Sequence, residues 1–242
     1  MESIEYIYKF EFDDGRTETF HIGLDAERLN PLDPLPVKLP AWTKLEFKQC
    51  PHCPLHPIEA SHCPLAARLV DMVDRMADVV SYNEVDVTVT IDERTITRSA
   101  TAQEGISSLM GIITATSGCP HTEFFKPMAR FHLPFASSDE TFYRAASMYM
   151  LGQYYRWQRD LAVDLELVGL KRFYEQVAIV NKGMAERIRA EKREDGTVNA
   201  IVLLDMFVKS MPHTVEETLM ELMPLFLPYL RERRIDTGDK EE

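Results

Sequence analysis

The chain has 242 residues, of which 45% are hydrophobic and 27% charged, and its formal net charge is -12. This composition is typical of a globular protein with one large domain or two small ones. The acidic balance argues against general nucleic-acid binding and against an anionic membrane surface, since both require an excess of Lys and Arg. No apolar run approaches the roughly 18 residues of a membrane span. The N-terminus lacks the pattern of a signal peptide, so we expect a cytoplasmic protein.

The first part of the chain is predicted to form a β-hairpin. Apolar and polar side chains alternate over residues 4–12, a turn follows at residues 14–15, and residues 17–22 return. A proline-rich connection then covers residues 31–40. Alternation at residues 45–47 predicts a short strand that leads into the first cysteine.

The next segment changes to a helical period after Cys63, with an apolar stripe at Leu69, Val73, Met76 and Val80. Residues 85–91 and 95–98 alternate in the manner of a second hairpin. Thr101 and Glu104 have the spacing of a capping box, which predicts a helix that continues to about residue 117.

The rest of the chain is predicted to be nearly all helix. A capping box at residues 137–140 begins a helix, a longer one covers residues 167–192, and another covers residues 198–210. Thr214 and Glu217 have the spacing that would cap a separate final helix.

Strands that precede helices in this way indicate an α+β fold, with N-terminal antiparallel hairpins and two helices followed by a C-terminal helical bundle. We expect a strand-rich region over residues 1–136, a helical region over residues 137–235, and a disordered, charged tail over residues 236–242.

The four cysteines are each followed by proline, and they are Cys50, Cys53, Cys63 and Cys119. The first two have the Cys-x-x-Cys spacing that lets two thiolates bind one ion from a single turn. All four lie at predicted junctions between elements, and each following proline stiffens the turn that holds the sulfur. In a reducing compartment, clustered cysteines favour a metal site over disulfides. Redox-active or catalytic thiols and inert buried cysteines are the alternatives.

Four thiolates suit either a structural zinc ion or an iron–sulfur cluster, and we favour zinc. Each of the histidines His52, His62 and His121 lies within two residues of a cysteine. A mixed site in which one of them replaces a thiolate is therefore an alternative.

A second candidate site lies between residues 114 and 136, where phenylalanines are interleaved with His121, Arg130 and His132. Aromatic side chains with a few polar groups are typical of a small-molecule pocket. The competing interpretation is a loop that its phenylalanines attach to the core. An enzyme that uses this pocket, with the metal as Lewis acid or support, is thus a further hypothesis.

Three segments carry a resemblance to known proteins: residues 48–55 (KQCPHCPL), 117–122 (SGCPHT) and 128–134 (MARFHLP). They resemble an uncharacterised family of bacterial proteins without an assigned activity, and the similarity covers nearly the whole chain. The resemblance implies a bacterial, intracellular protein. Our leading expectation is a non-enzymatic protein whose zinc site supports a surface for a protein partner, a small ligand or another subunit; the first alternative is a redox or sensory protein with an iron–sulfur cluster.

Overall fold

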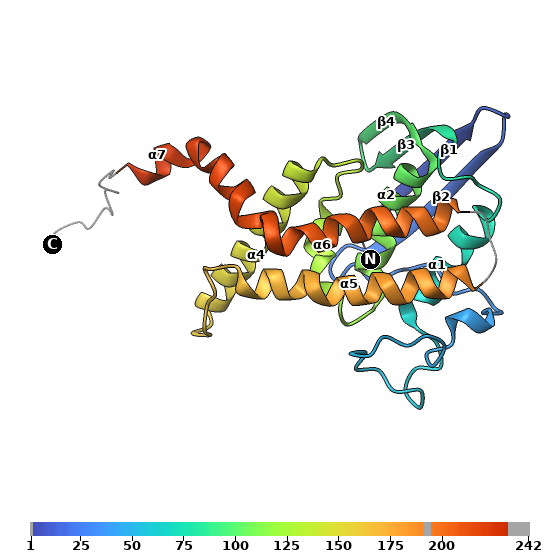
Figure 1. The fold of residues 1–242 in the computed structure, drawn as a ribbon, viewed down its shortest axis with the longest axis horizontal. Helices are drawn as coiled ribbons and strands as arrows, with labels where there is room; N and C mark the ends of the chain where they lie inside the picture. Colours follow the sequence, from blue (N-terminus) through green and yellow to red (C-terminus); the bar gives the residue numbers. More distant parts are fainter. Residues whose placement is uncertain (1, 191–194, 232–242) are drawn as a thin grey trace.

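The computed structural model describes residues 2–190 and 195–231, and it has the expected α+β fold (Figure 1). Four strands form one antiparallel sheet in the order β2-β1-β3-β4. The strands are β1 (Ser3–Phe12), β2 (Thr17–Asp25), β3 (Glu84–Ile91) and β4 (Arg94–Thr101). Both predicted hairpins are therefore confirmed, and they join through the central pair β1 and β3.

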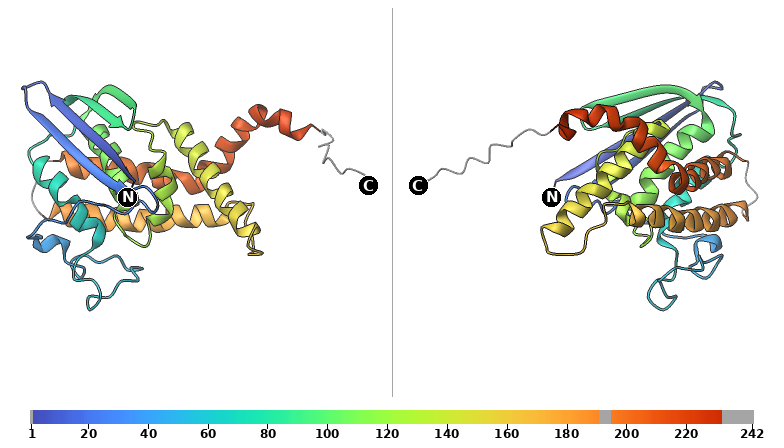
Figure 2. Two further views of the ribbon diagram at one scale, coloured as in Figure 1. Left: turned by 180° about the vertical axis from the view of Figure 1, so that it is seen from behind. Right: turned by 60° about the vertical axis from the view of Figure 1, so that its left-hand side comes forward.

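One face of the sheet is apolar and packs against helices (Figure 2). Tyr8 at the centre of β1 is opposite Phe20 on one side and Val89 on the other, and all three are buried. Period-two alternation places these side chains together and turns their polar neighbours outward. Helix α2 (Ala102–Thr116) approaches so closely that a Cβ added to Gly105 would lie 2.8 Å from the Phe10 ring.

The two helices of the N-terminal half begin where the sequence predicts. Helix α1 (Pro64–Arg75) follows Cys63 as its N-cap residue, and α2 begins after Thr101 with the expected capping box to Glu104. The strand predicted at residues 45–47 is wrong: these residues form a turn after the short 3-10 helix η1 (Ala41–Thr43). Their alternation has another cause, because Leu45 is buried in the core and Phe47 is half-buried, while Glu46 between them is exposed.

The C-terminal half is helical, as expected. After η2 (Glu123–Phe125) and α3 (Lys126–Arg130), its long helices are α4 (Ser138–Trp157), α5 (Val168–Arg189) and α6 (Gly196–Leu222). It ends in η3 (Met223–Phe226) and α7 (Leu227–Leu230). No helix of the described residues has the length and apolar character needed to cross a membrane.

Helix α6 corrects one prediction. A break was expected before a separate helix capped by Thr214, but α6 continues through Pro212. The Thr214 hydroxyl donates to the carbonyl of Ser210 instead of capping a helix. Met211 and Val215 on either side are fully buried, and this packing offsets the backbone hydrogen bond that Pro212 cannot make.

The structure contains two groups of buried apolar residues. The larger lies between the sheet and helices α1, α2, α5 and α6, and the smaller joins α4 to the same α5 and α6. Helices α5 and α6 of the predicted helical region therefore pack against the sheet as well as against α4. The division near residue 136 stays a prediction. The tail expected over residues 236–242 lies outside the described residues.

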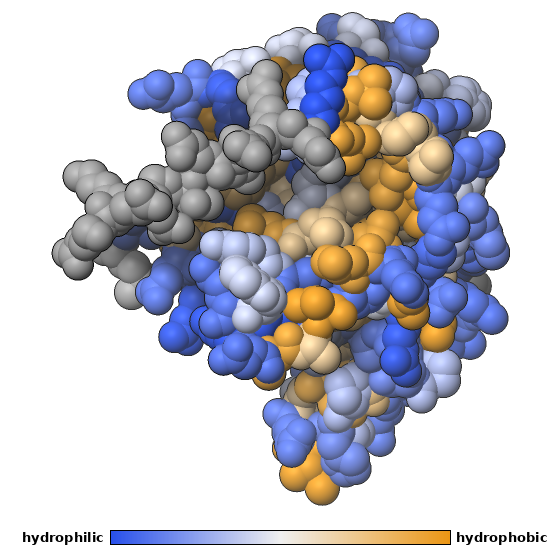
Figure 3. All heavy atoms as spheres, turned by 90° about the vertical axis from the view of Figure 1, so that its left-hand side faces the viewer, coloured by the Kyte–Doolittle hydropathy of each residue, from blue (hydrophilic) through white to orange (hydrophobic). Residues whose placement is uncertain are grey.

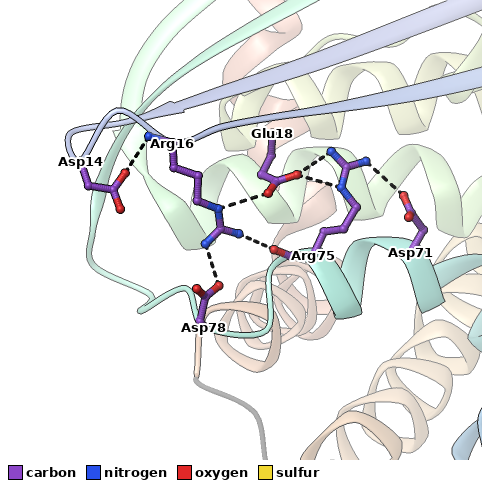
Figure 4. Close-up of polar contacts among 6 residues, drawn as sticks. All are labelled: Asp14, Arg16, Glu18, Asp71, Arg75 and Asp78. Atoms are coloured by element: carbon purple, nitrogen blue, oxygen red, sulfur yellow. Dashed lines mark hydrogen bonds and ion pairs between the residues drawn. The ribbon is translucent and has the colours of Figure 1, made fainter.

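An ion-pair network attaches the first hairpin to α1 (Figure 4). The Glu18 carboxylate accepts from Arg16 at 3.2 Å and from Arg75 at 2.6 Å. The Arg16 guanidinium also donates to Asp78 and to the backbone carbonyl of Arg75, and Arg75 donates to Asp71. Glu18 is thus the shared acceptor for two arginines from different elements.

We expect Glu18→Gln to destabilise the protein by about 1–2 kcal/mol, because two guanidinium groups lose their shared charged partner. Urea unfolding followed by circular dichroism measures this change. Asp71→Asn is the matched control, since Asp71 is an exposed partner of the same network and should cost less than about 0.5 kcal/mol. Equal effects of the two changes would contradict a central role for Glu18.

Candidate metal centre

The cysteines lie on three separate segments, each shaped by a local backbone feature. Cys50 and Cys53 span a tight turn in which the Cys53 N–H donates to the Cys50 carbonyl at 3.0 Å. The N–H of Cys63, the N-cap of α1, donates to the Thr43 carbonyl at 2.8 Å. Cys119 follows Gly118, whose φ of 85° ends α2 in the left-handed conformation that glycine tolerates.

Contacts between these segments bring the four cysteines to one region of the molecule. A Cβ added to Gly118 would lie 4.0 Å from Pro64, so the ends of α2 and α1 that carry Cys119 and Cys63 are adjacent. The His52 and His121 rings stack with their centroids 3.9 Å apart. His121 Nε2 also forms a 2.9 Å hydrogen bond with the His52 carbonyl. The turn with Cys50 and Cys53 therefore lies against the segment that follows Cys119.

Neighbouring thiols affect the protonation of Cys50 and Cys119. Burial, followed by the neighbouring thiols of Cys63 and Cys53, raises the pKa of Cys50 to about 11, against the opposing effect of Arg187. Burial likewise raises the pKa of Cys119 to about 11; a hydrogen bond from the His121 backbone lowers it, and Cys63 and Cys50 oppose this effect. Cys50 therefore acts on Cys119, both share the influence of Cys63, and Cys53 acts on Cys50.

Helix α5 supplies a buried positive charge beside the thiols. The Arg187 side chain is only 2% exposed, and its guanidinium donates to the backbone carbonyls of Trp42, Lys44 and Leu45 at 2.7, 2.8 and 2.9 Å. Burial lowers its pKa, whereas the nearby thiols of Cys63, Cys50 and Cys53 act in the opposite direction. Among the described residues its hydrogen-bond partners are backbone carbonyls. A buried guanidinium in this position favours negative charge nearby, which thiolates would supply.

Gly183, one turn before Arg187 on α5, allows the helix to approach the first cysteine pair. A Cβ at this position would lie 3.1 Å from Cys50 Sγ, closer than most carbon–sulfur packing. Residues four apart share one face of a helix, so Gly183 and Arg187 together face the cysteines. The spacing of the cysteines does not indicate that α5 contacts them. A glycine four residues before an arginine within a predicted helix is the signal in the sequence that could have suggested this contact.

Of the histidines beside the cysteines, His52 and His121 share one environment, whereas His62 has its own. His52 Nε2 lies 3.1 Å from the Gln176 carbonyl, whereas its Nδ1 is buried without a hydrogen-bond partner in the described residues. Burial, followed by the neighbouring His121, lowers the His52 pKa and favours a neutral ring. His62 Nδ1 lies 2.9 Å from the hydroxyl of Ser61. Of the three, His52 thus retains a buried nitrogen that is free to act as a ligand.

The four thiols are close without being arranged as a formed metal shell. Across residues 2–190 and 195–231, no three His, Cys, Asp or Glu side chains stand in positions that could hold a metal ion. The cysteines are free thiols, Cys119 buried and the other three half-buried. The donor chemistry fits a thiophilic ion, but the described side chains do not surround a common centre.

The residues of the second predicted site do not converge. His121 belongs to the cysteine region, stacked on His52. His132 lines a separate cavity, and neither His121 nor Arg130 is among the described residues that line it. The Arg130 guanidinium lies over the ring of Phe131 instead, 5.5 Å from its centroid.

Comparison with known families accounts for nearly the whole chain. The model of one family, Domain of unknown function (DUF6901), matches residues 6–227. The chain belongs to this family. The DUF6901 match begins in β1 and ends at the start of α7, so it includes all four cysteines and Arg187. No curated protein and no solved structure matches the chain.

Proposed function

We propose that this protein binds one structural metal ion, zinc, through Cys50, Cys53, Cys63 and Cys119. The observation that carries the proposal is the gathering of four thiols from three segments beside the buried guanidinium of Arg187. In this role the ion links the turn after η1, the start of α1 and the end of α2, which face α5. The site stabilises the helical half that presents a surface to a partner or a ligand.

Charge balance supports this assignment. Four thiolates around a divalent ion carry a net charge of -2, which is costly to bury without a compensating cation. Arg187 offsets half of that charge from its fixed place on α5. Because burial and the neighbouring thiols raise the pKa of Cys50 and Cys119, both stay protonated near pH 7 without a metal, and binding would release their protons.

An iron–sulfur cluster is the second candidate, because it also binds four cysteine thiolates in a buried, partly positive environment. The free Nδ1 of His52 favours a third arrangement, in which three cysteines and this histidine bind zinc. The resemblance noted above would place the protein in the bacterial cytoplasm, where such thiols stay reduced.

Metal analysis of the protein purified without oxygen tests the proposal. We expect a colourless protein with one zinc per chain and no inorganic sulfide. A brown protein with iron and sulfide would contradict the zinc assignment and support an iron–sulfur cluster. A protein that contains neither zinc nor iron would contradict both assignments. Retention of zinc in Cys50→Ser with loss in His52→Gln would identify a mixed site.

Stability of the cysteine variants provides an independent readout. Cys50→Ser and Cys119→Ser are each expected to lose the metal and to lower Tm by roughly 5–11 °C, because an ion present at a hundredfold its Kd stabilises by about 2.7 kcal/mol. His56→Asn is the matched control, since this exposed histidine lies on the same loop without belonging to the site. Unchanged metal content and Tm in both serine variants would identify the cysteines as inert thiols.

A further inference from the structure

A cavity of about 350 Å³ lies between α2, α4, α5 and α6. The residues of α5 that line it are different from Gly183 and Arg187, which face the cysteines. Its wall is mainly apolar, with Phe125, Phe135 and Phe207 among the lining residues. The face of the molecule that carries α4 and α7 is hollowed at its centre, with apolar side chains around the hollow (Figure 3). The cavity volume falls within the range of small-molecule sites, at its lower end.

One polar group in this wall has no partner. Asn181 is 6% exposed, and its Nδ2 is buried without a hydrogen bond within the described part of the chain. It lines the cavity together with Val177 and Tyr174, which come four and seven residues earlier on the same face of α5. A buried amide left unsatisfied costs about 1–3 kcal/mol. An acceptor within the cavity would remove that cost when the Asn181 amide turns its Nδ2 from the wall toward the cavity.

A positive charge lies toward the Tyr174 part of the cavity. Arg144 of α4 lines the wall, and its guanidinium affects the pKa of Tyr174. One of its nitrogens donates to the carbonyls of Met128 and Phe131 at 2.9 and 2.8 Å. Glu140, one turn earlier, accepts from the Ser137 N–H at 2.7 Å as part of the helix cap. The Glu140 carboxylate still acts on Arg144, since it opposes the lowering of the Arg144 pKa by burial, but it does not line the cavity. Among the described residues of the wall, the charge of Arg144 faces no carboxylate other than Glu104, which is paired with Arg98.

The other charged side chains in the wall offset each other. Arg98 and Glu104 line the cavity and form an ion pair at 3.5 Å, and Glu104 also accepts from the Thr101 N–H at 2.9 Å. His132 hydrogen bonds to Tyr8, and burial keeps its ring neutral. The net charge of the wall is thus positive and comes from Arg144.

Gly111 of α2 leaves room for an occupant. It lies inside a helix, where glycine costs about 1 kcal/mol relative to alanine. Its φ is not positive, and nothing lies within 4 Å of an added Cβ, so neither the backbone nor close packing requires glycine. Because Gly111 lines the cavity, a side chain at this position would take up cavity space.

We propose that this cavity binds a small oxo-carboxylic acid, with its carboxylate at Arg144, its carbonyl oxygen at the Asn181 amide and its carbon chain along the phenylalanines. Two turns of α5 separate Tyr174 from Asn181, about 10 Å of helix. A chain of seven or eight carbons therefore has a suitable length. This site is separate from the four cysteines and does not depend on the metal.

Ligand-detected NMR titration of the full chain with 7-oxooctanoate tests the proposal, with octanoate and 2-octanone as matched compounds. We expect saturable binding of 7-oxooctanoate and at least tenfold weaker binding of each compound that lacks one polar group. Absence of saturable binding would overturn the site. Equal affinity for octanoate would overturn the role of Asn181, and equal affinity for 2-octanone that of Arg144.

Two variants that should fold well locate the ligand. Asn181→Leu removes a buried unsatisfied group, and we expect it to bind 7-oxooctanoate and octanoate equally. Gly111→Leu is a better helix former that fills the cavity, and it should abolish binding. Gly152→Leu is the control, because Gly152 is also a helical glycine with open space around it but does not line the cavity. Binding by Gly111→Leu at the wild-type level would overturn the proposal.

Discussion

Replacement of Arg187 by methionine is expected to destabilise the protein by about 4 kcal/mol, or roughly 8–16 °C in Tm. Methionine fills much of the same volume but donates no hydrogen bond. The carbonyls of Trp42, Lys44 and Leu45 would lose the donors that Arg187 supplies. Each buried carbonyl left without a partner costs about 1–3 kcal/mol. The variant no longer buries a charged guanidinium, and this lost desolvation cost offsets part of the destabilisation. Urea unfolding measures the difference.

The control for this variant is Arg189→Met on the same helix, where the side chain is exposed and the expected change is within about 0.5 kcal/mol. Metal content should be measured on both variants, since Arg187 also balances the charge of the proposed site. Arg187→Lys should recover only part of the stability, because an ammonium group cannot reproduce the planar fork of donors. An Arg187→Met protein as stable as Arg189→Met would contradict the anchoring role.

Acidification is expected to remove about 3 kcal/mol of stability between pH 7 and pH 4 through His132 alone. This side chain is half-buried beside Tyr8 in the wall of the cavity, and desolvation there, with a smaller effect of Arg144, lowers its pKa from 6.5 to about 3. His132 is therefore protonated below about pH 6.5 in the unfolded chain but only below about pH 3 in the folded chain. The contribution is complete above pH 6.5 and is lost progressively as the pH falls through this window.

Comparison with His132→Gln isolates this effect, because the variant keeps a polar side chain but does not titrate. The free energy of unfolding, measured by urea titration at half-unit steps from pH 7 to pH 4.5, should fall less steeply in the variant than in the wild type. His52, whose pKa is also lowered, contributes in the same direction to both proteins and cancels in the comparison. His21→Gln, at an exposed position on β2, should retain the wild-type slope. Parallel curves for wild type and His132→Gln would contradict the prediction.

Local signals in the sequence account for most of the fold. Period-two alternation predicts both hairpins, and the capping boxes at Thr101 and Ser137 mark the starts of α2 and α4. The strand predicted at residues 45–47 and the separate helix predicted after Pro212 were wrong for a common reason, since tertiary packing overrides both local patterns. Alternation at residues 45–47 reflects burial of a turn, and the Thr-x-x-Glu spacing after Pro212 falls inside a helix that packing keeps continuous.

The candidate site could be predicted only in part, because its components differ in sequence separation. Proline after each cysteine indicates stiff junctions, and the structure brings those junctions together. Gly183 and Arg187 themselves lie more than sixty residues beyond the last cysteine, and they reach the site through the packing of α5. Neither residue type is a metal ligand, so no motif could select them. The pairing of the thiols with an ion remains the prediction that metal analysis will test.

The long reach of Arg187 has a consequence for synthesis of the chain. The Trp42 carbonyl precedes its donor by 145 residues. At roughly 5–20 residues per second, the ribosome needs about 7–29 seconds to cover that interval. By the end of this interval both hairpins, α1 and all four cysteines have been made, while the turn after η1 still lacks the helix that will hold it. The N-terminal half of the nascent chain thus lacks the contacts of Arg187 until α5 has been synthesised. Early binding of an ion by its thiols would order that half before α5 emerges.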